Sequence, residues 1–173
     1  MTWTAPEIDR VGGSLVAPEP ELLRGLLDFH RATMLHKCAG LTPEQLARAP
    51  IDVSNLSLLG LIRHLSKVER TWFRRRFSGE QIDVLYSTAE RPDADFEDVD
   101  PARAEADYAK LVEEQELARQ AVVEAPLDAT FVNERDGETM SLRLVFVHMI
   151  GEYARHNGHA DLIRQSVDGV KGY

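Results

Sequence analysis

The sequence has little cysteine: Cys38 is the single one among 173 residues. One cysteine cannot form an internal disulfide or a cysteine-rich zinc site, and this scarcity is typical of chains in a reducing cytosol. No apolar run approaches the ~18–20 residues that a membrane-spanning helix needs. The N-terminus also lacks the basic region and apolar stretch of a secretory signal. We therefore expect a cytoplasmic protein with no membrane partner.

Basic residues are fewer than acidic residues. The chain has 29 acidic and 20 basic residues, which gives a net charge of -9. Nucleic-acid binding depends on neutralising phosphates, so we expect no nucleic-acid partner. Much of the excess lies between Gly79 and Asp100, where there are eight acidic residues and one basic residue. We interpret this segment as a solvated, mobile loop that folding does not require.

Several motifs that carry chemistry are missing as well. The sequence contains no glycine-rich phosphate loop, no Walker motif and no serine nucleophile elbow. The chain therefore lacks the usual marks of a nucleotide-binding protein and of a serine hydrolase.

Four long stretches of apolar residues at helical spacing predict helices over about 19–38, 57–77, 101–124 and 141–166. Ser57 is the expected N-cap of the second helix and Gly79 its expected C-cap. Four helices of this length predict an all-α four-helix bundle, with a long connection between the second and third helices. Three arginines, 74–76, crowd the last turn of the second helix, and we interpret them as complements of the helix dipole rather than a binding patch.

The flanking segments have weaker patterns. We expect an N-terminal extension over 1–18, a bundle over 19–166 and a flexible tail over 167–173. Between the third and fourth helices, Asp136-Gly137 is a turn signal between two short runs, which favours a small hairpin.

The fourth helix carries an unusual polar group. At ~100° per residue, its members project from one arc about 80° wide that overlaps the apolar face; they are His148, Glu152, His156 and His159. A carboxylate buried there needs compensation, which a metal ion supplies. The rise of ~1.5 Å per residue places residues 148 and 156 about 12 Å apart, so one ion can share Glu152 with either His148 or His156.

A third ligand must come from another helix. His64, mid-way along the second helix at the edge of its apolar face, is the best candidate. Two histidines and one carboxylate leave an open coordination position, as in catalytic metal sites. The alternative is that each histidine is an ordinary hydrogen-bonded residue. By similar reasoning we interpret Glu69 as an ion-pair partner and Cys38 as a small core residue.

Two segments resemble a known family. Residues 57–73, SLLGLIRHLSKVERTWF, together with 151–161, GEYARHNGHAD, resemble the DinB-like superfamily, in particular a branch related to mycothiol-dependent maleylpyruvate isomerase. The likeness extends from about Leu22 to Gln165. It implies a four-helix bundle of DinB-like type whose divalent metal is held by His64, Glu152 and His156. Glu152 stands where many members have histidine, as in the thiol-dependent branch, and His159 stands where glutamine is frequent.

The resemblance implies a metal-dependent enzyme that uses a low-molecular-weight thiol such as mycothiol, as a transferase or isomerase acting on an electrophilic substrate. We expect Zn²⁺, with Ni²⁺ or Mn²⁺ as alternatives. His159 and His30 are the candidate catalytic hydrogen-bond donors, because each can present an N–H near the bundle interior. A metal-dependent hydrolase and a non-catalytic, stress-related metal-binding module remain alternative functions. A homodimer is compatible with all three.

Overall fold

The structure is a computed structural model that describes residues 3–171, and it is mostly helical. This confirms the prediction of an all-α chain with a small hairpin. In chain order the elements are α1 (Glu19–Cys38), α2 (Pro43–Ala47), α3 (Leu58–Glu69), the π-helix η1 (Arg70–Phe77), α4 (Ala94–Glu97), the 3-10 helix η2 (Pro101–Arg103), α5 (Ala104–Ala121), β1 (Thr130–Val132), β2 (Thr139–Ser141) and α6 (Leu142–Asp168). In the part of the chain described, none of these helices combines the length and the apolar character needed to cross a membrane.

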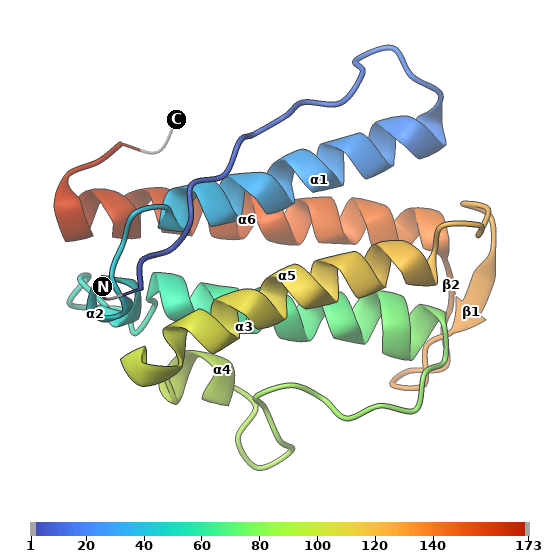
Figure 1. The fold of residues 1–173 in the computed structure, drawn as a ribbon. Helices are drawn as coiled ribbons and strands as arrows, with labels where there is room; N and C mark the ends of the chain where they lie inside the picture. The colour runs from blue at the N-terminus through green and yellow to red at the C-terminus, as the bar shows by residue number, and fades with distance from the viewer. Residues whose placement is uncertain (1–2, 172–173) are drawn as a thin grey trace.

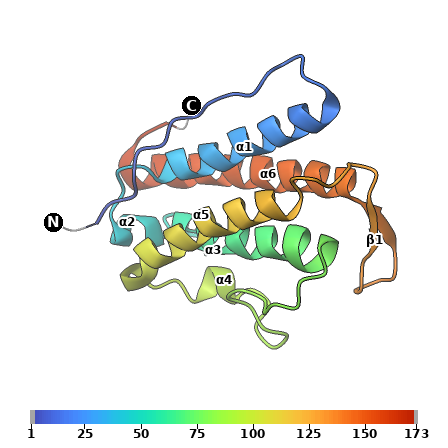
Figure 2. The same cartoon turned by 45° about the vertical axis from the view of Figure 1, so that its right-hand side comes forward.

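The long helices lie side by side in two pairs. Helix α1 packs along α6, and α5 packs along α3 (Figures 1 and 2). Both members of each pair run in the same direction, and the two pairs run in opposite directions (Figure 1). Ion pairs between Glu19 and Arg143 at one end and between Lys37 and Asp161 at the other fix α1 on α6.

Side-chain caps define where the helices begin. Ser57 Oγ accepts a hydrogen bond from the Gly60 backbone N–H at 3.0 Å, which confirms Ser57 as the N-cap of α3. Ser141 Oγ accepts from the Leu144 N–H at 3.3 Å and caps α6 in the same way. Helix α6 ends at Gly169, whose φ of 82° is the left-handed conformation that glycine adopts without strain.

Three of the four long helices differ from the predicted ones at their ends. The second predicted helix does not stay α-helical, because η1 forms its last eight residues, Arg70–Phe77. Helix α5 is preceded by the 3-10 turn of Pro101–Arg103 and ends at Ala121, before the predicted limit. Helix α6 continues through Val167 and Asp168, which we expected in the tail; residues 172–173 of that tail lie outside the described residues. The hairpin forms as predicted, with Phe131 paired to Met140.

The N-terminal extension packs onto the domain. The Ala5 N–H donates to the Leu41 carbonyl at 3.0 Å, and the Gly40 N–H donates to the Ala5 carbonyl at 2.8 Å. Farther along, the extension passes so close to α1 that a Cβ at Gly13 would lie 3.1 Å from the Cα of Gly25. Only residues without a side chain allow this approach of two backbones.

Apolar side chains from all four long helices form the core, together with the single cysteine. Cys38 has no exposed surface, and burial raises the pKa of its thiol to about 12. This confirms its interpretation as a core residue.

A buried polar network crosses this core. Arg31 donates two hydrogen bonds of 2.7 Å to the Glu69 carboxylate, which is completely buried. The Tyr153 hydroxyl donates to the same carboxylate at 2.8 Å and accepts from Gln115 Nε2 at 3.0 Å. The ion-pair interpretation of Glu69 is thus confirmed, and the network joins α1, α3, α5 and α6.

The acidic segment is exposed over most of its length, as expected of a solvated loop, but Ala94 and Asp95 in α4 are buried. Because α3 and α5 run in the same direction, the connection must return along the whole length of α3 (Figure 1). Within it, Asp95 is completely buried and the Phe96 ring stacks on His64. Arg63 donates hydrogen bonds of 3.0 Å to the carbonyls of Ala94 and Asp95. We now expect the part around α4 to contribute to stability.

The network at Glu69 gives a stability prediction. Glu69→Gln leaves the buried Arg31 with the half-exposed Asp28 as its remaining counter-charge, so it should lower the free energy of unfolding by about 3–5 kcal/mol in urea denaturation. Replacing both partners by methionine should restore much of this loss, since no buried charge remains unpaired. Asp98→Asn, at an exposed ion pair with Arg91, is the control and should leave the midpoint nearly unchanged. A Glu69→Gln protein as stable as this control would contradict the prediction.

Candidate metal centre

Helices α3 and α6 bring together three residues that can hold a metal ion. One ligand atom from each of His64, Glu152 and His156 lies within 4.8 Å of the others. Glu152 Oε2 lies 3.7 Å from His64 Nε2 and 3.4 Å from His156 Nε2. These separations exceed the usual 2.7–3.2 Å of an N–H···O hydrogen bond. They are close to the ~3.3 Å expected between two ligands of one tetrahedral zinc ion, given metal–ligand distances of ~2.0–2.2 Å.

The orientation of His64 fits a metal ligand. Its Nδ1 lies 2.8 Å from Asp95 Oδ2, which can only accept, so in the neutral ring Nδ1 carries the proton and Nε2 keeps a free lone pair. Nε2 is buried and, within residues 3–171, has no hydrogen-bond partner. A buried lone pair without a partner is costly in a protein interior. A metal ion satisfies it, and a carboxylate behind the ligating histidine is the usual supporting arrangement.

Asp95 is itself held in place. Lys67 Nζ lies 2.5 Å from Asp95 Oδ2, and Ser87 Oγ donates to Oδ1 at 3.2 Å. Burial alone would raise the pKa of Asp95, but hydrogen bonds from His64 and Lys67 outweigh it and lower the pKa to about 2. Asp95 therefore stays ionised. Sequence reasoning missed this residue, because nothing distinguishes it there from the neighbouring acids.

Electrostatics keep Glu152 ionised as well. The neighbouring His156 and His64 side chains lower the pKa of Glu152 well below its usual value. Burial opposes a charge on His64, yet its hydrogen bond to Asp95 and the nearby Glu152 raise its pKa overall. The centre thus presents one permanent negative charge between two imidazoles, a donor set suited to a divalent cation.

The structure also decides between the two histidines that sequence spacing left open beside Glu152. His156 joins the three-residue group. His148 Nε2 lies 4.0 Å from the other oxygen of Glu152, and its ring packs against Trp72 with a centroid distance of 4.2 Å. His148 is therefore a neighbour of the centre outside the group of three.

The two histidines expected to act in catalysis occupy different positions. His159 Nδ1 lies 3.3 Å from His156 Nδ1, so His159 contacts the back of a candidate ligand. The His30 ring packs against Phe29, while its backbone carbonyl accepts a hydrogen bond from Asn157. In the part of the chain that the structure describes, no hydrogen bond or ion pair joins the His30 ring to the centre. The structure thus brings His159 to the centre and does not bring the His30 ring into direct contact with it.

Solvent reaches this centre. The side chains of His64, Glu152 and His156 keep 17%, 19% and 9% of their surface exposed. The side chains of the centre are therefore partly exposed, although the Nε2 atom of His64 is itself buried.

Comparison with known proteins finds a match to one family model. The family model described as mycothiol-S-transferase matches residues 22–169, which include all three residues of the centre. No curated protein and no solved structure matches the chain. The match spans most of the chain and agrees with the resemblance read from the motifs around His64 and Glu152. The chain belongs to the mycothiol-S-transferase family, a DinB-like family.

Proposed function

We propose that the four long helices form a DinB-like bundle and that the protein is a cytoplasmic, divalent-metal-dependent enzyme that transfers or uses a low-molecular-weight thiol. His64, Glu152 and His156 would hold the ion, with Zn²⁺ the best fit to two imidazoles and one carboxylate. The observation that carries this proposal is the buried, unpartnered Nε2 of His64, aimed at Glu152 and backed by Asp95.

When bound, the ion would lower the pKa of a small thiol and favour its thiolate, the reactive form of sulfur. The charges of the three proposed ligands set how far the pKa of the thiol would fall. Two neutral imidazoles and the single charge of Glu152 would cancel only half of a divalent charge, so positive charge remains for an anionic sulfur. Asp95 fixes the tautomer and the ring orientation of His64.

The chain also supplies groups for proton transfer. His159 lies beside His156 and is the proposed hydrogen-bond donor to negative charge that develops on the substrate. His30, on the neighbouring helix α1, is the second proposed hydrogen-bond donor. The reacting sulfur would come from the cofactor, because the thiol of Cys38 is buried and protonated at neutral pH.

Metal retention tests the ligand set. The purified protein should retain about one equivalent of divalent metal, and His64→Ala and His156→Ala should each lose most of it, because each removes one of the three proposed protein ligands. His148→Ala is the matched control on the same helix and should retain the metal. Elemental analysis of the purified variants measures the content. Equal metal in all three variants would show that the ligands are wrong.

Asp95 gives a second prediction. Asp95→Asn keeps the shape but removes the carboxylate behind His64, so it should weaken metal binding by about 10–100-fold. Competition with a coloured chelator measures the affinity. Asp98→Asn is the control, because Asp98 lies in the same acidic segment but pairs with Arg91 at the surface. Equal metal affinities of the two variants would show that Asp95 does not support metal binding.

The thiol can be detected directly. In the cobalt-substituted protein, saturating mycothiol should produce a Co–S charge-transfer band, because thiolates are strong ligands for such ions. Bacillithiol and glutathione test the selectivity for the thiol. If all three thiols leave the spectrum unchanged, the thiol-dependent function is wrong, and the hydrolase or the non-catalytic metal-binding function takes its place.

A further inference from the structure

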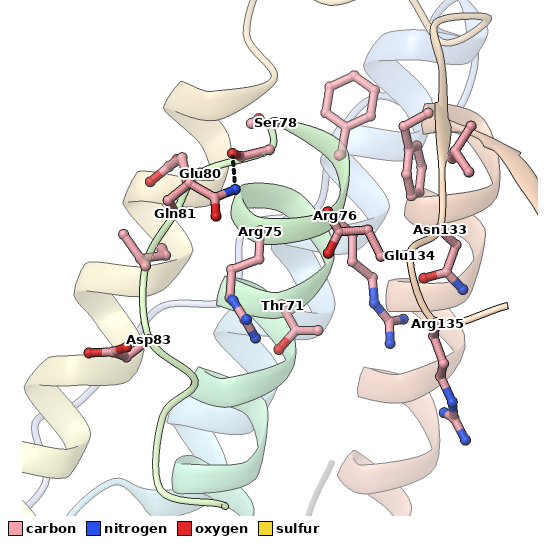
Figure 3. Close-up of a pocket in the computed structure, with 15 residues that line it drawn as sticks. Thr71, Arg75, Arg76, Ser78, Glu80, Gln81, Asp83, Asn133, Glu134 and Arg135 are labelled. Atoms are coloured by element: carbon pink, nitrogen blue, oxygen red, sulfur yellow. Dashed lines mark hydrogen bonds between the residues drawn. The ribbon is translucent and has the colours of Figure 1, made fainter. Parts of the chain in front are cut away.

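A large cavity lies outside the metal centre. It has a volume of about 870 Å³ and lies between η1, the segment that follows it and the β1–β2 hairpin (Figure 3). Its polar lining comes from Thr71, Arg75, Arg76, Glu80, Asp83, Asn133, Glu134 and Arg135. Neither the metal centre nor the expectations from sequence account for this cavity.

The π-helix shapes one wall of the cavity. In η1 the Ser78 N–H donates to the Phe73 carbonyl at 3.1 Å, five residues back, which is the wide π turn. Such turns are rare and frequently occur at functional sites. Here the wide turn carries Arg75 and Thr71, whose side chains lie next to each other in the cavity (Figure 3).

The arginines of η1 fall into two groups. Arg74 is neutralised, because it forms ion pairs with Glu80 at 2.8 Å and with Glu114 at 3.0 Å. Arg75 and Arg76 are half-buried and, among residues 3–171, form no ion pair. Arg75 and Arg76 therefore carry positive charge that no ion pair in the described chain neutralises.

Arg135 brings a third guanidinium to the rim of the cavity, again without an ion pair to any described carboxylate. Burial lowers the pKa of Arg76, and the positive charge of Arg135 lowers it further. Like charges gathered in this way repel each other, and an anion would relieve the repulsion.

The acidic residues of the lining do not cancel this charge. Glu80 is bound to Arg74, and Asp83 points away from the arginines (Figure 3). Glu134 lies exposed on the hairpin and has no ion pair within the described chain. Of the carboxylates that line the cavity, it is the one that would oppose an anion there; the charge of Asp136, outside the lining, also acts on Arg76.

We propose that Arg75 and Arg76, with Arg135 at the rim, bind the carboxylate or phosphate group of the electrophilic substrate. The fork of donors on a guanidinium matches the oxygens of either group. This inference rests on the proposed function, since it assigns an anionic group to the molecule that the thiol attacks.

A continuous chain of contacts joins the two sites. The Arg76 guanidinium lies over the Trp72 ring, with its carbon 4.2 Å from the ring centroid. Trp72 packs on His148, and His148 reaches Glu152. A substrate anchored at Arg76 would have to extend past Trp72 and His148 to bring its electrophilic carbon to the centre. The proposed substrate class is thus an extended organic acid or phosphate ester.

Fluorescence of Trp72 tests the site. The sequence has two tryptophans, so Trp3→Phe leaves Trp72, next to Arg76, as the single reporter. Titration with succinate or inorganic phosphate should change its emission with saturation, and neutral succinamide should not. The anion that binds more tightly at equal ionic strength identifies the source of the charge. No saturable response to either anion would overturn the proposal.

Matched variants separate this site from general attraction. In the Trp3→Phe background, Arg75→Gln and Arg76→Gln should each weaken anion binding by at least about tenfold, because a charge-assisted hydrogen bond is lost. Arg155→Gln is the control: this exposed arginine also has no ion pair in the described chain and lies outside the cavity lining. Loss of binding in Arg155→Gln equal to that in Arg75→Gln would contradict a specific site.

Two further variants complete the test. Glu134→Gln should strengthen anion binding, because it removes the opposing charge, whereas a merely structural role of the hairpin predicts no gain. His64→Ala should leave anion binding unchanged while metal is lost. If metal and thiol binding fail but the anion still binds, the proposed function is wrong and the anion site stands. If metal and thiol bind but the anion does not, only this inference fails.

Discussion

A carboxylate removed from water must find a counter-charge and hydrogen-bond donors, and Glu69 imposes that requirement at the centre of this protein. Arg31 and Tyr153 meet it from two other helices, and Gln115 on a third donates to the Tyr153 hydroxyl. The geometry of these bonds fixes how each helix is rotated and how far it is shifted along its axis. Glu69 lies on the same helix as His64, and Tyr153 follows Glu152 directly. The buried network therefore aligns the two helices that carry the candidate metal ligands.

Helix direction imposes a second constraint. Because α3 and α5 run in the same direction, the chain needs a connection that returns along α3 (Figure 1). That connection passes over the candidate metal centre and there places Asp95 behind His64. A segment that topology requires thus also orients a ligand. Its remaining acids stay near the surface, where Asp98 and Glu97 pair with Arg91.

Local patterns in the sequence predict much of the fold and part of the candidate metal centre. The spacing of apolar residues and N-caps such as Ser57 predict the long helices. The rotation and rise per residue of an α-helix predict that the polar residues around Glu152 share one face. The choice between His148 and His156 depends on the height of His64 on another helix, which spacing cannot supply. Asp95 is one of many similar acids until tertiary contacts bury it. The π turn is equally hidden, because a run such as 57–77 shows the same apolar period whether or not its end widens.

The burial of Cys38 protects its thiol from modification by electrophiles. Electrophiles modify cysteines through the thiolate, and a thiol with a pKa of about 12 is almost never ionised at neutral pH. Its side chain also has no exposed surface for an electrophile to reach. Under the proposed function, electrophilic carbon compounds would meet the sulfur of the bound thiol, and the buried Cys38 would not compete for them.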